Sequence, residues 1–176
     1  NGVALATHDA AWTIQSGTWS IKDNASAATV AGMAYYTAFA DDDMTVDQMH
    51  PNGGVAAGPA ARCATGETTC YSSVMASATL VQVRKIVAGT PTFLASVSPN
   101  QSFSTARVNA IDALGTAITG TLDASTGGTS DSAISGEDRP GMYQGTGSSI
   151  ATHSTWNATD NIASVGNRRR RMLLGV

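Results

Sequence analysis

The stretch that decides the fold is residues 55–97, VAAGPAARCATGETTCYSSVMASATLVQVRKIVAGTPTFLASV. In 79–87, β-branched residues dominate and apolar residues alternate with polar ones, which favours a strand over a helix. Gly and Pro in 88–91 supply the backbone of a tight turn. Residues 92–97 then return as a strand, with Phe93, Ala95 and Val97 on one face. With the two segments before it, this pattern predicts four antiparallel strands in a row.

Two cysteines lie within this stretch at the spacing of a short hairpin. Cys63 and Cys70 are placed symmetrically about Gly66 and Glu67, the expected turn. Directly opposed residues of two antiparallel strands have Cβ atoms about 4.5–5.5 Å apart. A disulfide needs a slightly shorter separation of about 3.5–4.5 Å. The sequence therefore leaves two outcomes open, a cross-strand Cys63–Cys70 disulfide or two packed free thiols.

The composition indicates one β-rich domain. The 176 residues suffice for a sizeable core. Only 13% of them are charged, and small residues are abundant, as in chains with many short strands and turns. This composition is more typical of extracellular or virion proteins than of cytosolic enzymes. The chain starts at Asn1, so we expect that upstream residues were cleaved or lie outside this sequence.

Charge is unevenly distributed along the chain. The net charge is −3, and Arg168, Arg169, Arg170 and Arg171 supply four of the ten basic residues. The rest of the chain therefore carries about −7, which argues against nucleic-acid binding by its body. We divide the chain into a β-domain, residues 1–166, and a basic tail, residues 167–176. We expect the tail to dock on a partner protein, and the alternatives are a solvated tail or one that binds nucleic acid or a membrane.

Turn signals about 8–12 residues apart separate further short strands. We expect a strand in 1–8, a hairpin over 12–21, a strand over 28–39 interrupted at Gly32, strands at 44–49 and on both sides of Gly115, a loop over 124–140 and a last strand at 160–165. No helical periodicity persists. The pattern predicts an all-β chain, folded as an antiparallel sandwich or barrel.

A series of short motifs follows a characteristic order along residues 8–166. In chain order the motifs are Trp12, Ser16-Gly17-Thr18-Trp19-Ser20-Ile21, Ala34-Tyr35-Tyr36, Met44-Thr45-Val46, Gly58-Pro59-Ala60-Ala61-Arg62, Cys70-Tyr71, Val83-Arg84-Lys85-Ile86-Val87-Ala88-Gly89, Thr121-Leu122-Asp123, Ser135-Gly136, Arg139-Pro140-Gly141-Met142-Tyr143 and Asp160-Asn161-Ile162. Their order resembles the concanavalin-A-like lectin/glucanase superfamily, in its laminin-G-like branch. The resemblance implies an antiparallel jelly-roll β-sandwich with one concave sheet. It also implies binding of glycans or proteins, and some members hydrolyse polysaccharides.

The resemblance extends to phage virion modules, which occur in tail fibres, spikes and capsid decorations. The basic C-terminal ending is similar to those of phage structural proteins. We therefore predict a non-enzymatic virion structural protein, a capsid decoration or a tail or fibre component, whose lectin-like module contacts host-surface glycans. Its expected partners are other virion proteins, copies of itself and cell-surface glycans, with neither nucleic acid nor a membrane. The alternative is a secreted carbohydrate-binding module of a longer extracellular protein.

Enzymatic chemistry finds little support in the sequence. Glycoside hydrolysis requires a pair of carboxylates that flank the scissile bond. The only glutamates, Glu67 and Glu137, lie far apart in turn-like segments, and side chains of the adjacent Asp41–Asp43 would alternate between faces of a strand. The histidines come without a Gly-x-Ser-x-Gly elbow. We expect no enzymatic activity and name no catalytic residue.

The superfamily binds glycans through exposed aromatic side chains on the concave face. The candidates here are Trp156, Tyr36, Tyr71 and Tyr143, and Trp156 comes first because it lies in a polar, loop-like run.

The superfamily also implies a structural calcium ion where the last strand meets the amino-terminal region. Asp160 matches its acidic position, and backbone carbonyls would supply other oxygens. The alternative role of Asp160 is to cap a turn, and the loop that contains Asp123, Asp131, Glu137 and Asp138 is a second acidic candidate. No other cofactor is expected.

Overall fold

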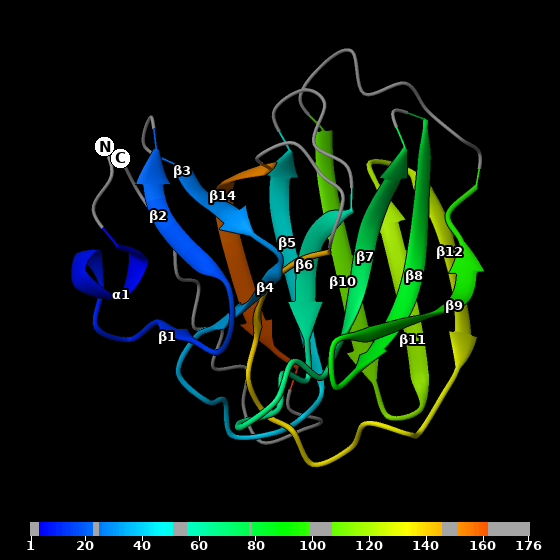
Figure 1. Ribbon diagram of the computed structural model, residues 1–176. Helices are drawn as coiled ribbons and strands as arrows, with labels where there is room; N and C mark the ends of the chain where they lie inside the picture. The colour runs from blue at the N-terminus through cyan, green and yellow to red at the C-terminus, as the bar shows by residue number, and fades with distance from the viewer. Residues whose placement is uncertain are drawn as a thin grey trace.

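The computed structural model describes residues 4–22, 25–50, 56–77, 79–98, 107–145 and 151–161. In these residues, two seven-stranded sheets pack face to face, and a single-turn helix, α1 (Leu5–His8), precedes the first strand (Figure 1). The predicted antiparallel β-sandwich is confirmed. No helix within the described ranges is long and apolar enough to cross a membrane.

Sheet I has the strand order β1-β4-β13-β6-β7-β8-β9. Its strands are β1 (Thr13–Ile14), β4 (Gly32–Tyr35), β13 (Gly141–Gln144), β6 (Ala57–Ala61), β7 (Cys70–Ser77), β8 (Leu80–Val87) and β9 (Thr90–Ser96). Neighbouring strands are antiparallel throughout. β6 to β9 lie side by side in chain order, which confirms the four strands predicted from residues 55–97.

Sheet II has the strand order β12-β11-β10-β5-β14-β3-β2. Its strands are β12 (Ser125–Ser130), β11 (Ala117–Leu122), β10 (Arg107–Leu114), β5 (Met44–His50), β14 (Ala151–Asp160), β3 (Ala25–Val30) and β2 (Thr18–Lys22). The pairs are again antiparallel. Residues 125–130, predicted as loop, thus form an edge strand.

The first forty residues depart most from the sequence prediction. Residues 5–8 form a helical turn that buries Leu5, not a strand. The predicted hairpin over 12–21 is wrong, because β1 belongs to sheet I and β2 to sheet II. At Gly32, where an interruption of the strand was predicted, the chain passes from β3 of sheet II to β4 of sheet I. A Cβ there would lie 2.2 Å from the carbonyl oxygen of Ser16, so only glycine permits this approach.

The core between the sheets is closed at one end by three aromatic rings. The centroid of Trp12 lies 5.3 Å from that of Tyr36 and 4.8 Å from that of Trp156, both in edge-to-face geometry. Such pairs add stability beyond the area that they bury. The indole N–H of Trp156 donates to the carbonyl of Gly141, at 3.1 Å, and thereby ties β14 of sheet II to β13 of sheet I.

A buried arginine joins the loops at the edge of the sandwich. The side chain of Arg62 is 2% exposed. Its guanidinium donates to the carbonyl oxygens of Asp42, Ile134 and Gly115 and to the Asp43 carboxylate. It also forms ion pairs with Asp42 and Asp43. One side chain thus holds three loops that are distant in sequence.

A second polar cluster fixes the segment after β12. The Tyr71 hydroxyl donates to Asp131 and accepts from the N–H of Ile134, while the Lys85 ammonium group lies 2.8 Å from Asp131. Burial, with the hydrogen bond to Asp131, raises the pKa of Tyr71 to about 12. Burial alone would raise the pKa of Asp131, but hydrogen bonds from Lys85 and Tyr71 outweigh it and hold that pKa below its ordinary value.

Candidate functional site

The outer face of sheet I carries the candidate site. Val83 of β8 faces sheet II, because a Cβ on Gly120 of β11 would lie 2.7 Å from its methyl carbon. Successive side chains of a strand point to opposite faces, so Arg84 points outward. A second buried apolar cluster covers this outer face and consists of Met33, Ala60, Cys63, Cys70, Val74, Ile86 and Tyr143.

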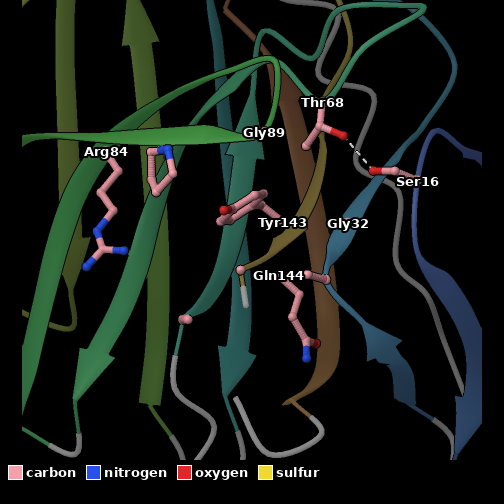
Figure 2. Close-up of a pocket in the computed structure, with 11 residues that line it drawn as sticks. Ser16, Gly32, Thr68, Arg84, Gly89, Tyr143 and Gln144 are labelled. Atoms are coloured by element: carbon pink, nitrogen blue, oxygen red, sulfur yellow. Dashed lines mark hydrogen bonds between the residues drawn. The ribbon is translucent and has the colours of Figure 1, made fainter. Parts of the chain in front are cut away.

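A cavity of about 220 Å³ opens beside this cluster (Figure 2). The lining residues are Ser16, Ala31, Gly32, Ala56, Thr68, Arg84, Gly89, Pro91, Tyr143, Gln144 and Gly145. Five of the eleven are glycine or alanine, so backbone forms much of the wall. The cavity is smaller than the usual range for small-molecule sites, about 300–1,000 Å³. Its size therefore suits one compact group, such as a single sugar ring.

Hydrogen bonds hold one wall of the pocket in place. The hydroxyl oxygens of Ser16 and Thr68 are 2.6 Å apart, as the dashed line in Figure 2 marks. Ser16 Oγ also accepts from the N–H of Met33, and the Thr68 carbonyl accepts from the N–H of Gly89 in the β8–β9 turn. Four segments are thus linked to one another, and two hydroxyl groups are preorganised at the pocket.

Tyr143 lies between the Ser16–Thr68 pair and Arg84 (Figure 2). Its side chain is 96% buried, since the residue is 4% exposed, and its hydroxyl has no hydrogen-bond partner among the described residues. Burial raises the pKa of this hydroxyl, which therefore stays protonated at neutral pH. A Cβ on Gly145 would lie 3.2 Å from the hydroxyl oxygen, so glycine leaves that oxygen room for a ligand.

Arg84 forms the opposite side of the pocket and is held by a neighbour on its own strand. Its Nε and Nη2 atoms both donate to Gln82 Oε1, at 3.1 and 2.8 Å. Gln82 and Arg84 lie two residues apart on β8 and therefore share the outer face. The partly buried guanidinium is thereby oriented beside the cavity.

Most of the aromatic side chains named from the sequence lie elsewhere. Trp156 and Tyr36 belong to the core between the sheets, and Tyr71 is fully buried under residues 131–134. The predicted exposure of Trp156 is wrong, because it occupies an inward position of β14 and not a loop. Only Tyr143 lines the pocket. It offers a hydroxyl group and not an exposed ring face.

Sequence reasoning missed the other polar groups of the pocket. Ser16 and Thr68 lie in connecting segments, and nothing in their local pattern places them together. Arg84 carried a usable signal, because the alternation in β8 puts it on the face opposite Val83 and thus away from the core.

Asp160 retains one feature that a cation would satisfy. Its Oδ2 accepts from the N–H of Ala40, at 3.1 Å, whereas its buried Oδ1 has no hydrogen-bond partner among the described residues. A carboxylate oxygen of this kind fits the predicted calcium ion as one ligand. The nearby carboxylates of Asp41, Asp42 and Asp43 lie within 4.8 Å of one another. Two of them already pair with Arg62, so calcium with Asp160 as ligand stays a prediction.

The two cysteines are present as free, buried thiols, the second of the two outcomes left open by the sequence. Burial, together with a hydrogen bond to Cys70, raises the pKa of Cys63 well above its ordinary value. Both side chains belong to the apolar cluster on the outer face of sheet I.

The two glutamates lie nearer each other than their sequence separation suggests. Burial raises the pKa of Glu137, and the negative charges of Asp138 and Glu67 raise it further. Neither glutamate lines the pocket. The acidic residues of 131–138 instead form ion pairs within the protein, with Lys85 and Arg139.

Comparison with solved structures identifies the fold. The structure is similar to the carbohydrate-binding module CBM66 from Bacillus subtilis, with a TM-score of 0.67 and 16% identity, over 84% of this chain and 94% of that one. The chain has the concanavalin-A-like jelly-roll fold. Lower scores relate it to a Bacillus licheniformis β-glucanase (TM-score 0.47, 11% identity, 89% and 87% coverage) and to the Crh5 transglycosylase in complex with NAG (0.41, 12%, 89% and 85%). No family model and no curated protein matches the sequence.

The jelly-roll fold predicted from the sequence is thus confirmed, whereas the virion placement stays a prediction. Arg168–Arg171 and the boundary between residues 166 and 167 lie outside the described residues. The expected docking of the tail, the virion partners and the virion or extracellular location therefore stay predictions as well.

Proposed function

We propose that the chain is a non-catalytic carbohydrate-binding module and that the pocket on the outer face of sheet I holds one sugar residue. The observation that carries the proposal is Tyr143, a side chain more than nine-tenths buried whose hydroxyl lines a cavity without a partner among the described residues. A tyrosine hydroxyl can both donate and accept, so a ligand in the cavity can supply the hydrogen bond that the described residues do not. The similar fold of a carbohydrate-binding module supports the same class of function.

The chemistry of the lining matches a neutral or charged sugar ring. A sugar offers hydroxyl groups that both donate and accept, and Tyr143, Ser16 and Thr68 can do the same. The Arg84 guanidinium adds donors on the opposite side. The Gly and Ala residues of the wall let the ring approach the backbone closely.

The lining supports binding without bond cleavage. None of the eleven lining residues is Asp, Glu or His. Hydrolysis of a glycosidic bond requires an acid and a second carboxylate about 5–9.5 Å apart on either side of it. We therefore expect that a bound oligosaccharide is released intact, with no reducing ends produced during prolonged incubation.

The test is binding of the purified chain to an array of oligosaccharides, followed by calorimetry with the strongest binder. Tyr143→Phe removes only the hydroxyl and should weaken binding about 3- to 10-fold, the usual worth of a neutral hydrogen bond. Thr68→Val should weaken it similarly. Thr129→Ala, at an exposed position on the edge strand β12 of sheet II and outside the pocket lining, serves as the matched control and should bind like the wild type. Absence of binding to every oligosaccharide, or unchanged affinity in Tyr143→Phe, would overturn the proposal.

A further inference from the structure

Arg84 differs from the other cationic side chains that the structure describes. Arg62, Lys85, Arg107 and Arg139 each form an ion pair with an aspartate or a glutamate. Arg84 bonds to the neutral amide of Gln82 instead, and no carboxylate of the described residues pairs with it. Its positive charge is therefore uncompensated at the edge of the pocket.

The remaining donors of Arg84 are available in a fixed orientation. A guanidinium group has five N–H donors in a planar fork. Gln82 occupies two of them, which leaves three without a partner among the described residues. An arginine already oriented by a neighbour loses less side-chain entropy when it binds a ligand. Its planar fork matches a flat or tetrahedral oxyanion, and such charge-assisted hydrogen bonds are about twice as strong as neutral ones.

Phe93 lies directly beside Arg84 on the same outer face. The two residues are opposed across the β8–β9 pair, which places their side chains as neighbours. Phe93 is 55% exposed, and no other aromatic side chain in the described part of the chain is exposed. Pro91, two residues earlier on the same strand, lines the cavity. An exposed ring face thus continues the surface that leads out of the pocket.

From these neighbours we propose that the pocket takes saccharides that carry an anionic group, a carboxylate or a sulfate, which Arg84 binds, while Phe93 supports the adjoining sugar ring. This inference rests on the proposed function and adds the ligand class. The pocket alone holds about one ring, so the second contact at Phe93 makes the ligand an oligosaccharide.

The experiment begins with an array that presents uronate-bearing, sulfated and neutral oligosaccharides to the wild-type chain. The strongest binder is then measured by calorimetry beside its matched neutral counterpart, carboxyl-reduced or desulfated. The acidic form should bind at least about tenfold more tightly, the usual worth of hydrogen bonds to a charged group. The uronate and sulfate arms show which anion the site takes.

Variants separate the roles of the two residues. Arg84→Gln should bring the acidic ligand down to the affinity of its neutral counterpart, while Arg84→Lys should keep part of the preference. Arg107→Gln removes an arginine that is already paired with Asp123 and should change nothing. Phe93→Ala should weaken acidic and neutral forms alike, by about 3- to 10-fold, and Phe93→Tyr should bind like the wild type.

The outcomes distinguish this inference from the function on which it rests. If neutral oligosaccharides bind as tightly as acidic ones, the anionic ligand class is wrong and the carbohydrate-binding function stands. If acidic ones are preferred equally by wild type and Arg84→Gln, the assignment to Arg84 is wrong. If the wild type binds no oligosaccharide, both proposals fall.

Discussion

Replacing the buried Arg62 by methionine should destabilise the fold more than the loss of any surface arginine. The change removes four hydrogen bonds, three to backbone carbonyls of separate loops and one to the Asp43 carboxylate. Methionine keeps an unbranched stem of similar width but lacks the guanidinium group, so most of the loss comes from the missing polar contacts. The carboxylates of Asp42 and Asp43 are left without their cation.

The size of the stability loss depends on how well the carboxylates of Asp42 and Asp43 are hydrated once Arg62 is replaced. Removal of one member of a buried ion pair costs about 3–5 kcal/mol of unfolding free energy. The side chains of Asp42 and Asp43 are 23% and 26% exposed, so their charges recover part of their hydration. The lower end, about 3 kcal/mol, is therefore expected. For a chain of this length that corresponds to a fall in Tm of about 6–12 °C.

Urea unfolding, followed by tryptophan fluorescence, measures this loss, because Trp12, Trp19 and Trp156 are all buried. Arg107→Met is the matched control. Its ion pair with Asp123 has side chains 23% and 37% exposed, so less than about 1 kcal/mol should be lost. If Arg62→Met costs no more than Arg107→Met, the interpretation of Arg62 as the residue that joins the loops is refuted.

Three further predictions test other parts of the fold. The pKa of Asp131 is lowered in the folded chain, so the carboxylate contributes fully to stability above about pH 4–5 and loses this contribution as the pH falls through the folded pKa. Asp131→Asn should therefore flatten the acid side of a curve of stability against pH. An unchanged acid side would contradict the stabilising role of the contacts that Asp131 makes with Lys85 and Tyr71. Cys63 and Cys70 should react with a thiol reagent at pH 8 only after unfolding, and rapid labelling of the native chain would contradict their burial. Calcium should raise the Tm of the wild type and leave that of Asp160→Asn unchanged. A wild-type Tm that is equal in calcium and in EDTA would refute the predicted calcium site.

Sequence reasoning succeeded where one strand follows another within the same sheet. In 79–97 the alternation of apolar and polar residues, with Gly and Pro at the turn, determines both strands and their connection. It failed where consecutive strands separate into different sheets. β1 and β2 flank Ser16-Gly17 as a hairpin would, but whether two strands pair with each other is decided by distant partners such as β4 and β3.

The predicted exposure of Trp156 was wrong for a related reason. A tryptophan in a polar run such as 153–157 resembles a loop residue, yet here Trp156 lies in a long strand and faces the core, while the adjacent Thr155 is exposed. The polarity of neighbouring residues does not reveal which face of a strand packs against the core. The pocket is harder still, because its lining comes from connections and strand ends spread over residues 16–145, and only the topology brings them together.

A single irregularity in β9 places Phe93, an exposed aromatic residue, beside the pocket. Strict alternation puts Phe93 on the same face as Ala95 and Val97, toward the core. In the structure Ala95 is opposite Val83 and Phe93 is opposite Arg84, so β9 has one extra residue, Leu94, at this point. Leu94 and Ala95 both pack against the core, and Phe93 is turned outward. A β-bulge reverses the facing of every residue beyond it, and bulges are common beside functional sites. The departure from alternation, which the sequence pattern cannot encode, is thus what places an aromatic ring beside Arg84.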